Sequence, residues 1–148
     1  MAWGKTYSGK YSVKNKNKYA GNHKNVVYRS MWERQAFKWC DSEPRVEAWN
    51  SEEVVVPYVS SVDGKRHRYY IDLQLKMNNK IYLVEIKPKN QTRPPKKKAK
   101  TKKYITEVTT YATNTSKWKA ASEFAKDRGW IFEIWTEDTL RGLGIKII

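Results

Sequence analysis

The first helical pattern in the chain begins at Ser30, where the residues Ser-Met-Trp-Glu are typical of a capping box that opens a helix. Apolar residues then recur at positions i, i+4, i+7 and i+8 and share one face: Trp32, Ala36, Trp39 and Cys40. The pattern predicts a helix that ends near residues 41–44, where the chain reaches a proline.

Three successive strands are predicted after this helix. β-Branched and alternating apolar residues fill three segments, and residues with turn propensity separate them. The first segment contains Pro57, which indicates an edge strand or a bulge, and the turn signal Asp63-Gly64 follows it. The strands are expected at residues 53–59, 66–75 and 81–87.

The last third of the chain predicts helices and one further strand. Residues 100–113 place four apolar side chains on one helical face: Tyr104, Val108, Tyr111 and Ala112. Another helix around residues 118–125 ends at Gly129, and a strand at 130–135 and a short capped helix at 136–140 follow. This order of a helix, three antiparallel strands, a helix or helix pair and a strand predicts an α+β fold, with a mixed sheet against helices.

Composition narrows the class of protein. The chain has 148 residues, which fits one domain, and 39 % of them are hydrophobic, which is enough for a core and excludes general disorder. No apolar run approaches the roughly 18 residues of a membrane span, and the first residues lack the apolar region of a secretory signal. The single cysteine, Cys40, excludes an intrachain disulfide and a multi-cysteine zinc site.

The net charge of +15 is concentrated in two segments, residues 1–29 and 87–103, which carry no acidic residue. We interpret residues 1–28 as an extended basic arm that becomes ordered against a partner, and residues 29–148 as the folded domain. A solubilising tail is the alternative for the arm, but its interleaved tyrosines favour contact. The excess charge favours nucleic acid over an anionic membrane, because the basic segments are broken by Asn, Gly and Pro and form no amphipathic helix.

Two carboxylates and a lysine are expected to meet near the end of the third strand. Because alternate residues of a strand share a face, Glu85 and Lys87 point to the same side, and the hairpin brings Asp72 close to Glu85. Such a set suits a phosphodiesterase in which carboxylates hold Mg²⁺ and a lysine orients the attacking water. Glu33 is a candidate third carboxylate, although it also fits the capping box. A solvated hairpin face with a cross-strand ion pair is the structural alternative.

Longer stretches of the chain resemble the PD-(D/E)XK nuclease superfamily. They lie at residues 28–33, 49–53, 57–58, 68–72, 85–89, 91–95, 107–112 and 127–130. Within the superfamily the chain is similar to the branch that contains the endonuclease subunit of Tn7-type transposases and, more closely, the head completion nucleases of T4-like phages. The likeness covers roughly residues 7–140, and it departs from the superfamily pattern at Ile71, where the name has a proline.

The resemblance implies a restriction-endonuclease-like core in the order α-β-β-β-α-β. It also implies that Glu33, Asp72 and Glu85 surround Mg²⁺ and that Lys87 is the active-site lysine. The implied activity is that of a metal-dependent deoxyribonuclease, an endonuclease or exonuclease that cuts or trims packaged double-stranded DNA. The alternative is a structural protein of the virion neck that binds DNA ends with an inert nuclease fold.

The implied setting is the completion of a phage head and its joining to the tail. We expect portal or neck proteins as partners, and no membrane or small-molecule cofactor. The expected location is the neck of the virion, and the host cytoplasm during assembly. Backbone phosphates are expected to contact the basic residues after the third strand, namely Lys89, Arg93, Lys96, Lys97, Lys98, Lys100, Lys102 and Lys103.

The tryptophans are expected mainly in the core, because most of them follow the apolar periodicity of helices or strands. Trp49 is the exception, since it lies beside Asn50 and Ser51, and it is a candidate for contact with a ligand.

Overall fold

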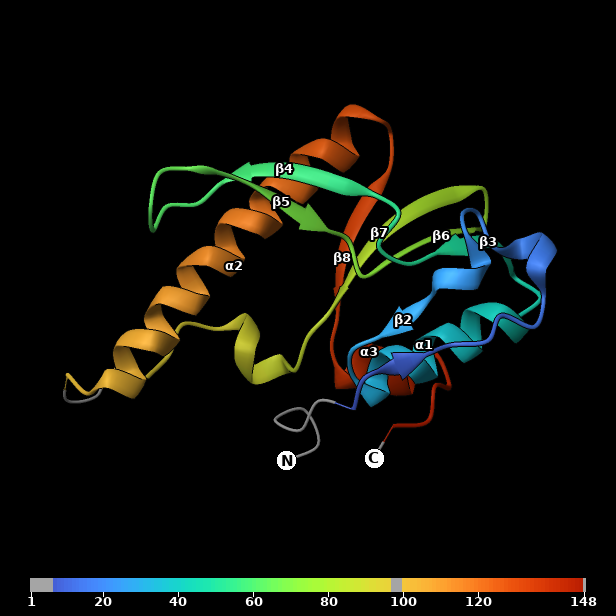
Figure 1. Ribbon diagram of the computed structural model, residues 1–148, viewed down its shortest axis with the longest axis horizontal. Helices are drawn as coiled ribbons and strands as arrows, with labels where there is room; N and C mark the ends of the chain where they lie inside the picture. Colours follow the sequence, from blue (N-terminus) through green and yellow to red (C-terminus); the bar gives the residue numbers. More distant parts are fainter. Residues whose placement is uncertain (1–6, 97–99, 148) are drawn as a thin grey trace.

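A four-stranded mixed sheet lies at the centre of the computed structural model, which describes residues 7–96 and 100–147 (Figure 1). In spatial order the strands are β3 (Val46–Asn50), β6 (Leu73–Met77), β7 (Lys80–Ile86) and β8 (Ile131–Trp135). β6 pairs antiparallel with both β3 and β7, and β8 pairs parallel with β7. The predicted α+β class with a mixed sheet flanked by helices is confirmed.

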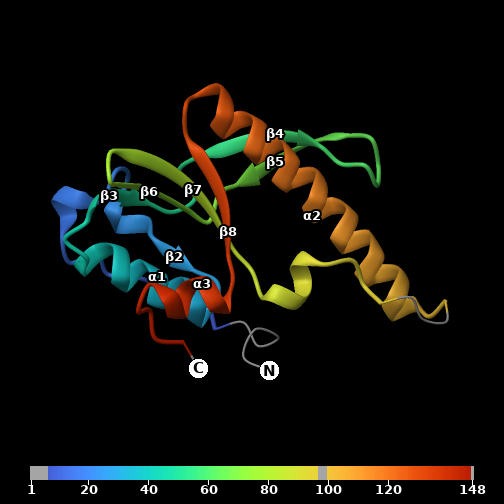
Figure 2. The ribbon, with the colours of Figure 1, turned by 180° about the vertical axis from the view of Figure 1, so that it is seen from behind.

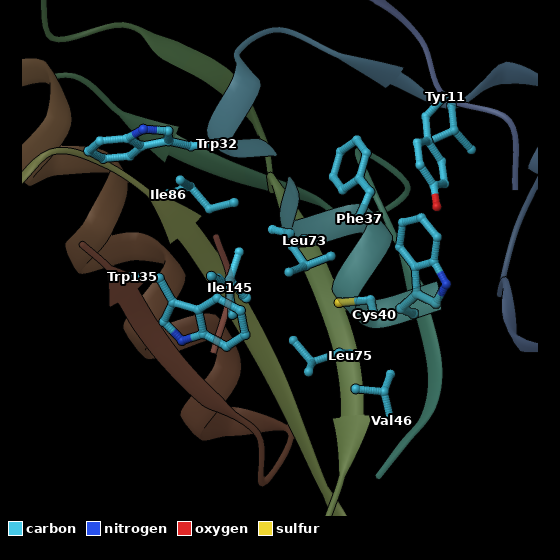
Figure 3. Packing of buried hydrophobic residues seen from close by; sticks show 14 of the residues in the cluster. Tyr11, Trp32, Phe37, Cys40, Val46, Leu73, Leu75, Ile86, Trp135 and Ile145 are labelled. Carbon is cyan, nitrogen blue, oxygen red and sulfur yellow. The ribbon is translucent and has the colours of Figure 1, made fainter. Parts of the chain in front are cut away.

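One face of the sheet packs against helix α1 (Met31–Ser42) and the short helix α3 (Glu137–Gly142). Figure 3 shows Phe37 and Cys40 of α1 against Leu73 and Leu75 of β6. Ile86 and Trp135 extend the same layer across β7 and β8. The predicted apolar stripe of α1 is therefore a core stripe, and Cys40 is a fully buried core residue.

The other face of the sheet packs against helix α2 (Lys102–Asp127), which lies on the opposite side from α1 and α3 (Figure 2). Leu83 of β7 contacts this layer, whereas its neighbour Val84 belongs to the α1 layer, as strand alternation requires. Trp118, Ala121 and Ala125 of α2 complete the second layer. The helix is continuous where the sequence left open a helix pair.

The two halves of α2 differ in their surroundings. Its buried residues all lie from Asn114 onward, and its first turns project away from the sheet (Figure 1). Of the apolar face predicted over residues 100–113, Val108 is exposed and Tyr111 is partly buried against the second core layer. None of the helices in the described part of the chain is long and apolar enough to cross a membrane.

The expected strand at residues 66–75 is in fact two strands. β5 (Arg66–Tyr70) pairs with β4 (Val55–Val59) in a separate hairpin, and β6 joins the central sheet. The chain changes sheets at Ile71 and Asp72, which places Asp72 at a junction instead of inside a strand. The hairpin packs on α2 through Val56, Tyr58 and Tyr69 of the second core layer.

The strand β3 was not predicted, and the interpretation of Trp49 as a ligand contact is wrong. Trp49 is 1 % exposed and packs against the rings of Tyr11, Tyr19 and Phe37. These contacts come from segments far apart in the sequence, so the polar neighbours of Trp49 gave no sign of them. The α-β-β-β-α-β order holds for the central unit, with β3 as its first strand and the β4–β5 hairpin inserted after it.

The described part of the basic N-terminal segment is not an arm that awaits a partner. It contains a short β1–β2 hairpin (Gly9–Lys10 and Val27–Tyr28) and the 3₁₀ turns η2 (Lys16–Lys18) and η3 (His23–Asn25). Its apolar residues join the first core layer: Tyr11, Val13, Tyr19 and Val26. The buried carboxylate of Asp41 in α1 accepts hydrogen bonds from the Tyr11 hydroxyl (2.9 Å) and from two backbone N–H groups of the segment. Long-range packing of this kind has no helical or strand period, which is why the sequence indicated an extended arm.

Candidate active site

An open cleft of about 390 Å³ brings together the predicted acidic residues and the predicted lysine. Glu33, Asp72, Glu85 and Lys87 all line it. Glu33 comes from the first turn of α1, and Glu85 from the end of β7. Because Leu73 pairs with Val84 in the antiparallel ladder, the next positions outward are Asp72 and Glu85, on neighbouring segments. Register, and not sequence proximity, therefore assembles the cleft.

Hydrogen bonds hold both central carboxylates in place. The backbone N–H of Ile86 donates to Asp72 Oδ2 at 2.9 Å, and the Tyr69 hydroxyl donates to Glu85 Oε1 at 2.8 Å. The Lys87 ammonium lies 3.6 Å from Glu85 Oε2. Glu85 thus meets a neutral donor at one oxygen and a cation at the other. These contacts restrict the rotation of the two carboxylates that the cleft depends on.

Burial and neighbouring carboxylates raise the pKa of two of the acidic groups, Asp72 and Glu33. Burial raises the pKa of Asp72 well above its ordinary value, and the charges of Glu85 and Glu33 add to this effect. Burial also raises the pKa of Glu33, to about 7, although the N–H of Arg29 opposes the rise. A concentration of hard carboxylate oxygens that repel one another is the donor chemistry that suits a divalent cation.

The arrangement is not a preformed metal cage. Within residues 7–96 and 100–147, no group of three carboxylate, histidine or cysteine side chains is positioned to hold an ion. Asp72 and Glu85 fit as a ligand pair on adjoining segments, and a cation between them would relieve the repulsion that raises the pKa of Asp72. A metal at this site would take its remaining ligands from water or from phosphate oxygens, as Mg²⁺ does in nucleotide-processing enzymes.

Glu33 takes part in capping α1 and also lines the cleft. The Ser30 hydroxyl accepts a hydrogen bond from the Glu33 N–H at 3.2 Å, which is the first half of a capping box. The Glu33 carboxylate accepts from the Arg29 N–H at 3.1 Å, where a full box would use Ser30. Its side chain is nevertheless 6 % exposed and lines the cleft beside the other carboxylates.

Sequence reasoning missed several residues that complete the cleft. Tyr69 was expected only as an apolar residue, and its hydroxyl contact with Glu85 spans 16 positions that no local pattern connects. Lys117 of α2 lies with its ammonium 5.5 Å from the centre of the Tyr69 ring, and nothing in the helix pattern distinguished it. Arg68 lies exposed at the rim on β5.

An ion pair between Arg29 and Glu52 lines another part of the cleft. Both residues belong to the stretches that resemble the nuclease superfamily. Arg29 donates to both carboxylate oxygens of Glu52, at 2.8 and 3.0 Å. Glu52 adopts φ = 57°, in the left-handed region that non-glycine residues seldom occupy. This backbone turn directs the Glu52 carboxylate back to the cleft, and unusual conformations of this kind concentrate at functional sites.

The predicted DNA-binding lysines do not all face the cleft. Lys89 forms an ion pair with Asp138 at 3.0 Å, and its backbone N–H donates to Glu137, so it belongs to the α3 side of the molecule. Arg93 lines a second cavity beside α2. Lys97 and Lys98 lie outside the described residues. The remaining members are exposed around the start of α2: Lys96, Lys100, Lys102 and Lys103. Their contact with DNA stays a prediction.

Comparisons with known proteins show which family the chain resembles. The family described as "TnsA-like endonuclease N terminal" matches residues 43–137, which include Asp72, Glu85 and Lys87. The chain is 44 % identical over 146 residues to the head completion nuclease of Enterobacteria phage T4, with 95 % of this chain and 97 % of that protein covered. No solved structure matches the chain. The observed fold fits the restriction-endonuclease-like core expected of such domains, and the chain belongs to the TnsA-like endonuclease family.

Proposed function

We propose that this protein is a Mg²⁺-dependent deoxyribonuclease that cuts or trims double-stranded DNA while a phage head is completed. The observation that carries the proposal is the convergence of Asp72, Glu85 and Lys87 in one open cleft. The name of the phage T4 relative, "Head completion nuclease", supports the nuclease activity and its setting.

Each side chain in the cleft has a distinct role in the proposed reaction. Asp72 and Glu85 would hold Mg²⁺, with Glu33 as a third ligand or as an acceptor for a metal-bound water. When bound, the metal would lower the pKa of a water molecule and offset the charge of the scissile phosphate. Lys87 would orient the attacking water, and the hydroxyl of Tyr69 holds Glu85 in position.

The cations around the cleft supply a path for the DNA backbone. Arg68 and Lys117 flank the carboxylates on the β5 and α2 sides. Exposed lysines around the start of α2 would add further positive charge to this path: Lys96, Lys100, Lys102 and Lys103. Because phosphate contacts release counterions, binding should weaken steeply as the salt concentration rises.

The setting in the particle is part of the same proposal. Action at head completion places the protein at the neck of the virion, with portal or neck proteins as its partners, and in the host cytoplasm during assembly. The alternative, a neck protein with an inert nuclease fold, would be favoured by a cleft filled with its own side chains. The cleft is instead open and partly lined by exposed polar groups, which favours the enzyme.

A titration of plasmid nicking with Mg²⁺ tests this proposal. The wild-type protein should convert supercoiled plasmid to nicked circles only with the metal, and Lys87→Ala should reduce the rate at least 100-fold, because the attacking water loses its orienting group. Lys80→Ala is the matched control, since Lys80 is exposed at the opposite end of the same strand. Equal nicking by wild type and Lys87→Ala, or nicking that persists in excess chelator, would overturn the proposal.

A further inference from the structure

A second hollow adjoins the cleft along helix α2. It has a volume of about 190 Å³ and lies between α2 and the segment that follows β7, which contains the 3₁₀ turn η4 (Lys89–Thr92). Asn90 and Gln91 line it on one wall, and Glu107 and Asn114 line it on the other. Nothing in the proposed cleavage reaction uses this hollow.

On both walls, residues that line the second hollow lie close along the chain to residues that line the cleft. On α2, Asn114 precedes the cleft residue Lys117 by three positions, which is about 4.5 Å along a helix axis. On the other wall, Gln91 follows the cleft residue Lys87 by four positions. A DNA strand whose phosphate lies in the cleft would therefore carry a neighbouring nucleotide to this second hollow.

One polar atom in the lining of the second hollow lacks a partner. Glu107 Oε1 is enclosed and receives no hydrogen bond from the described residues. Asn114, on the same wall, is only 6 % exposed. Buried polar atoms in proteins almost always have partners, so Glu107 Oε1 indicates a missing donor. With a single carboxylate and with Arg93 at its edge, the hollow does not suit a metal ion.

The chemistry of the lining selects the ligand. The volume lies below the roughly 300–1,000 Å³ of sites for drug-sized molecules, so the hollow suits one heterocyclic ring. The ring of Tyr111 and the methylenes of Pro95 offer flat apolar surface to such a ring. A carboxylate oxygen without a donor selects a base with an exocyclic amino group, as when Glu accepts from the N4 amino group of cytosine.

We propose that this hollow binds one unpaired nucleobase with an exocyclic amino group, next to the site of cleavage. The inference rests on the proposed function, because it requires DNA in the neighbouring cleft. It adds a substrate preference: DNA that offers an unpaired nucleotide, such as a frayed end or a bulge, binds better than a continuous duplex. Extruding a base is least costly where it is already unpaired.

Binding of short duplexes in chelator, followed by fluorescence anisotropy, tests the inference. The duplexes are fully paired, or carry one bulged cytosine, or carry one bulged thymine. Wild type should bind the cytosine bulge about tenfold more tightly than the paired duplex, and more tightly than the thymine bulge. Glu107→Ala, which removes the acceptor, should lose the preference for cytosine over thymine and still bind the paired duplex like wild type. Glu123→Ala, exposed on the same helix, is the matched control and should behave like wild type.

The outcomes separate this inference from the proposed function. If wild type binds the paired duplex but shows no preference for the bulged cytosine, or if Glu107→Ala keeps that preference, the inference fails and the nuclease proposal stands. If wild type binds none of the duplexes, the nuclease proposal fails and the inference fails with it. If thermal melting shows that Glu107→Ala does not fold, Gln91→Ala on the opposite wall takes its place and should reduce the preference at least threefold; an unchanged preference would overturn the inference.

Discussion

Replacement of Glu33 by glutamine should stabilise the metal-free protein at alkaline pH. Burial and the neighbouring carboxylates raise the pKa of Glu33 from 4.5 to about 7. The folded protein therefore holds a proton on this group that the unfolded chain releases between these two values. Folding takes up a proton in that window, so the free energy of unfolding falls as pH rises from about 4.5 to about 7.

The size of the effect follows from the same two values. At 1.36 kcal/mol for each pKa unit, the difference between 4.5 and about 7 corresponds to about 3 kcal/mol lost above pH 7. Glutamine has the same shape, stays neutral and can still accept the hydrogen bond from the Arg29 N–H. Because Asp72 shares the same electrostatic field, we expect Glu33→Gln to gain about 2–3 kcal/mol at pH 8 and less than about 1 kcal/mol at pH 5.

Urea unfolding in chelator, followed by tryptophan fluorescence at pH 5 and pH 8, measures this difference. Glu47→Gln is the matched control, because Glu47 is exposed on β3 and should give no gain at either pH. Mg²⁺ added at pH 8 should stabilise wild type more than Glu33→Gln, since a bound cation relieves the repulsion that the substitution removes. A variant that is no more stable than wild type at pH 8 would refute the idea that crowded carboxylates destabilise the metal-free cleft.

Three further substitutions test other contacts. Asp41→Ala should lower the free energy of unfolding by about 3 kcal/mol in urea titrations, because it leaves buried donors of the N-terminal segment unpaired; a loss below about 1 kcal/mol would contradict this. Tyr69→Phe should weaken Mn²⁺ binding by about tenfold in calorimetry with little change in melting temperature, because Glu85 loses the donor that orients it; unchanged affinity would contradict that role. Lys117→Ala should raise KM for DNA several-fold and reduce its salt dependence, unlike the exposed control Lys119→Ala, and equal effects of the two would remove Lys117 from the DNA path.

The sequence was most informative where geometry is periodic. Strand alternation predicted that Leu83 and Glu85 lie on one face and Val84 on the other, and the structure confirms this. A tight turn between two strands also fixes register, so the approach of Asp72 to Glu85 followed from the hairpin. The closeness of Asp72 and Glu85 could therefore be predicted from the sequence, even though the strand that was expected to carry Asp72 is interrupted there.

Contacts between segments that are distant in the sequence could not be predicted in the same way. The five residues of β3 include a charge and show no clean alternation, and their burial depends on rings from the N-terminal segment and α1. The N-terminal segment is held in place by hydrogen bonds to Asp41, which lies more than 25 positions away from its partners. Tyr69 and Lys117 reach the cleft only because the hairpin packs on α2. No period in the sequence encodes these tertiary contacts.

The most direct test of the central claim compares cleavage and binding in the same variants. Asp72→Ala and Glu85→Ala should abolish Mg²⁺-dependent nicking of plasmid DNA and bind duplex DNA as tightly as wild type, because each loses a metal ligand and keeps the surrounding cations. Asp127→Ala, exposed at the end of α2, is the control and should nick at the wild-type rate. Undiminished nicking by either purified cleft variant would contradict the account.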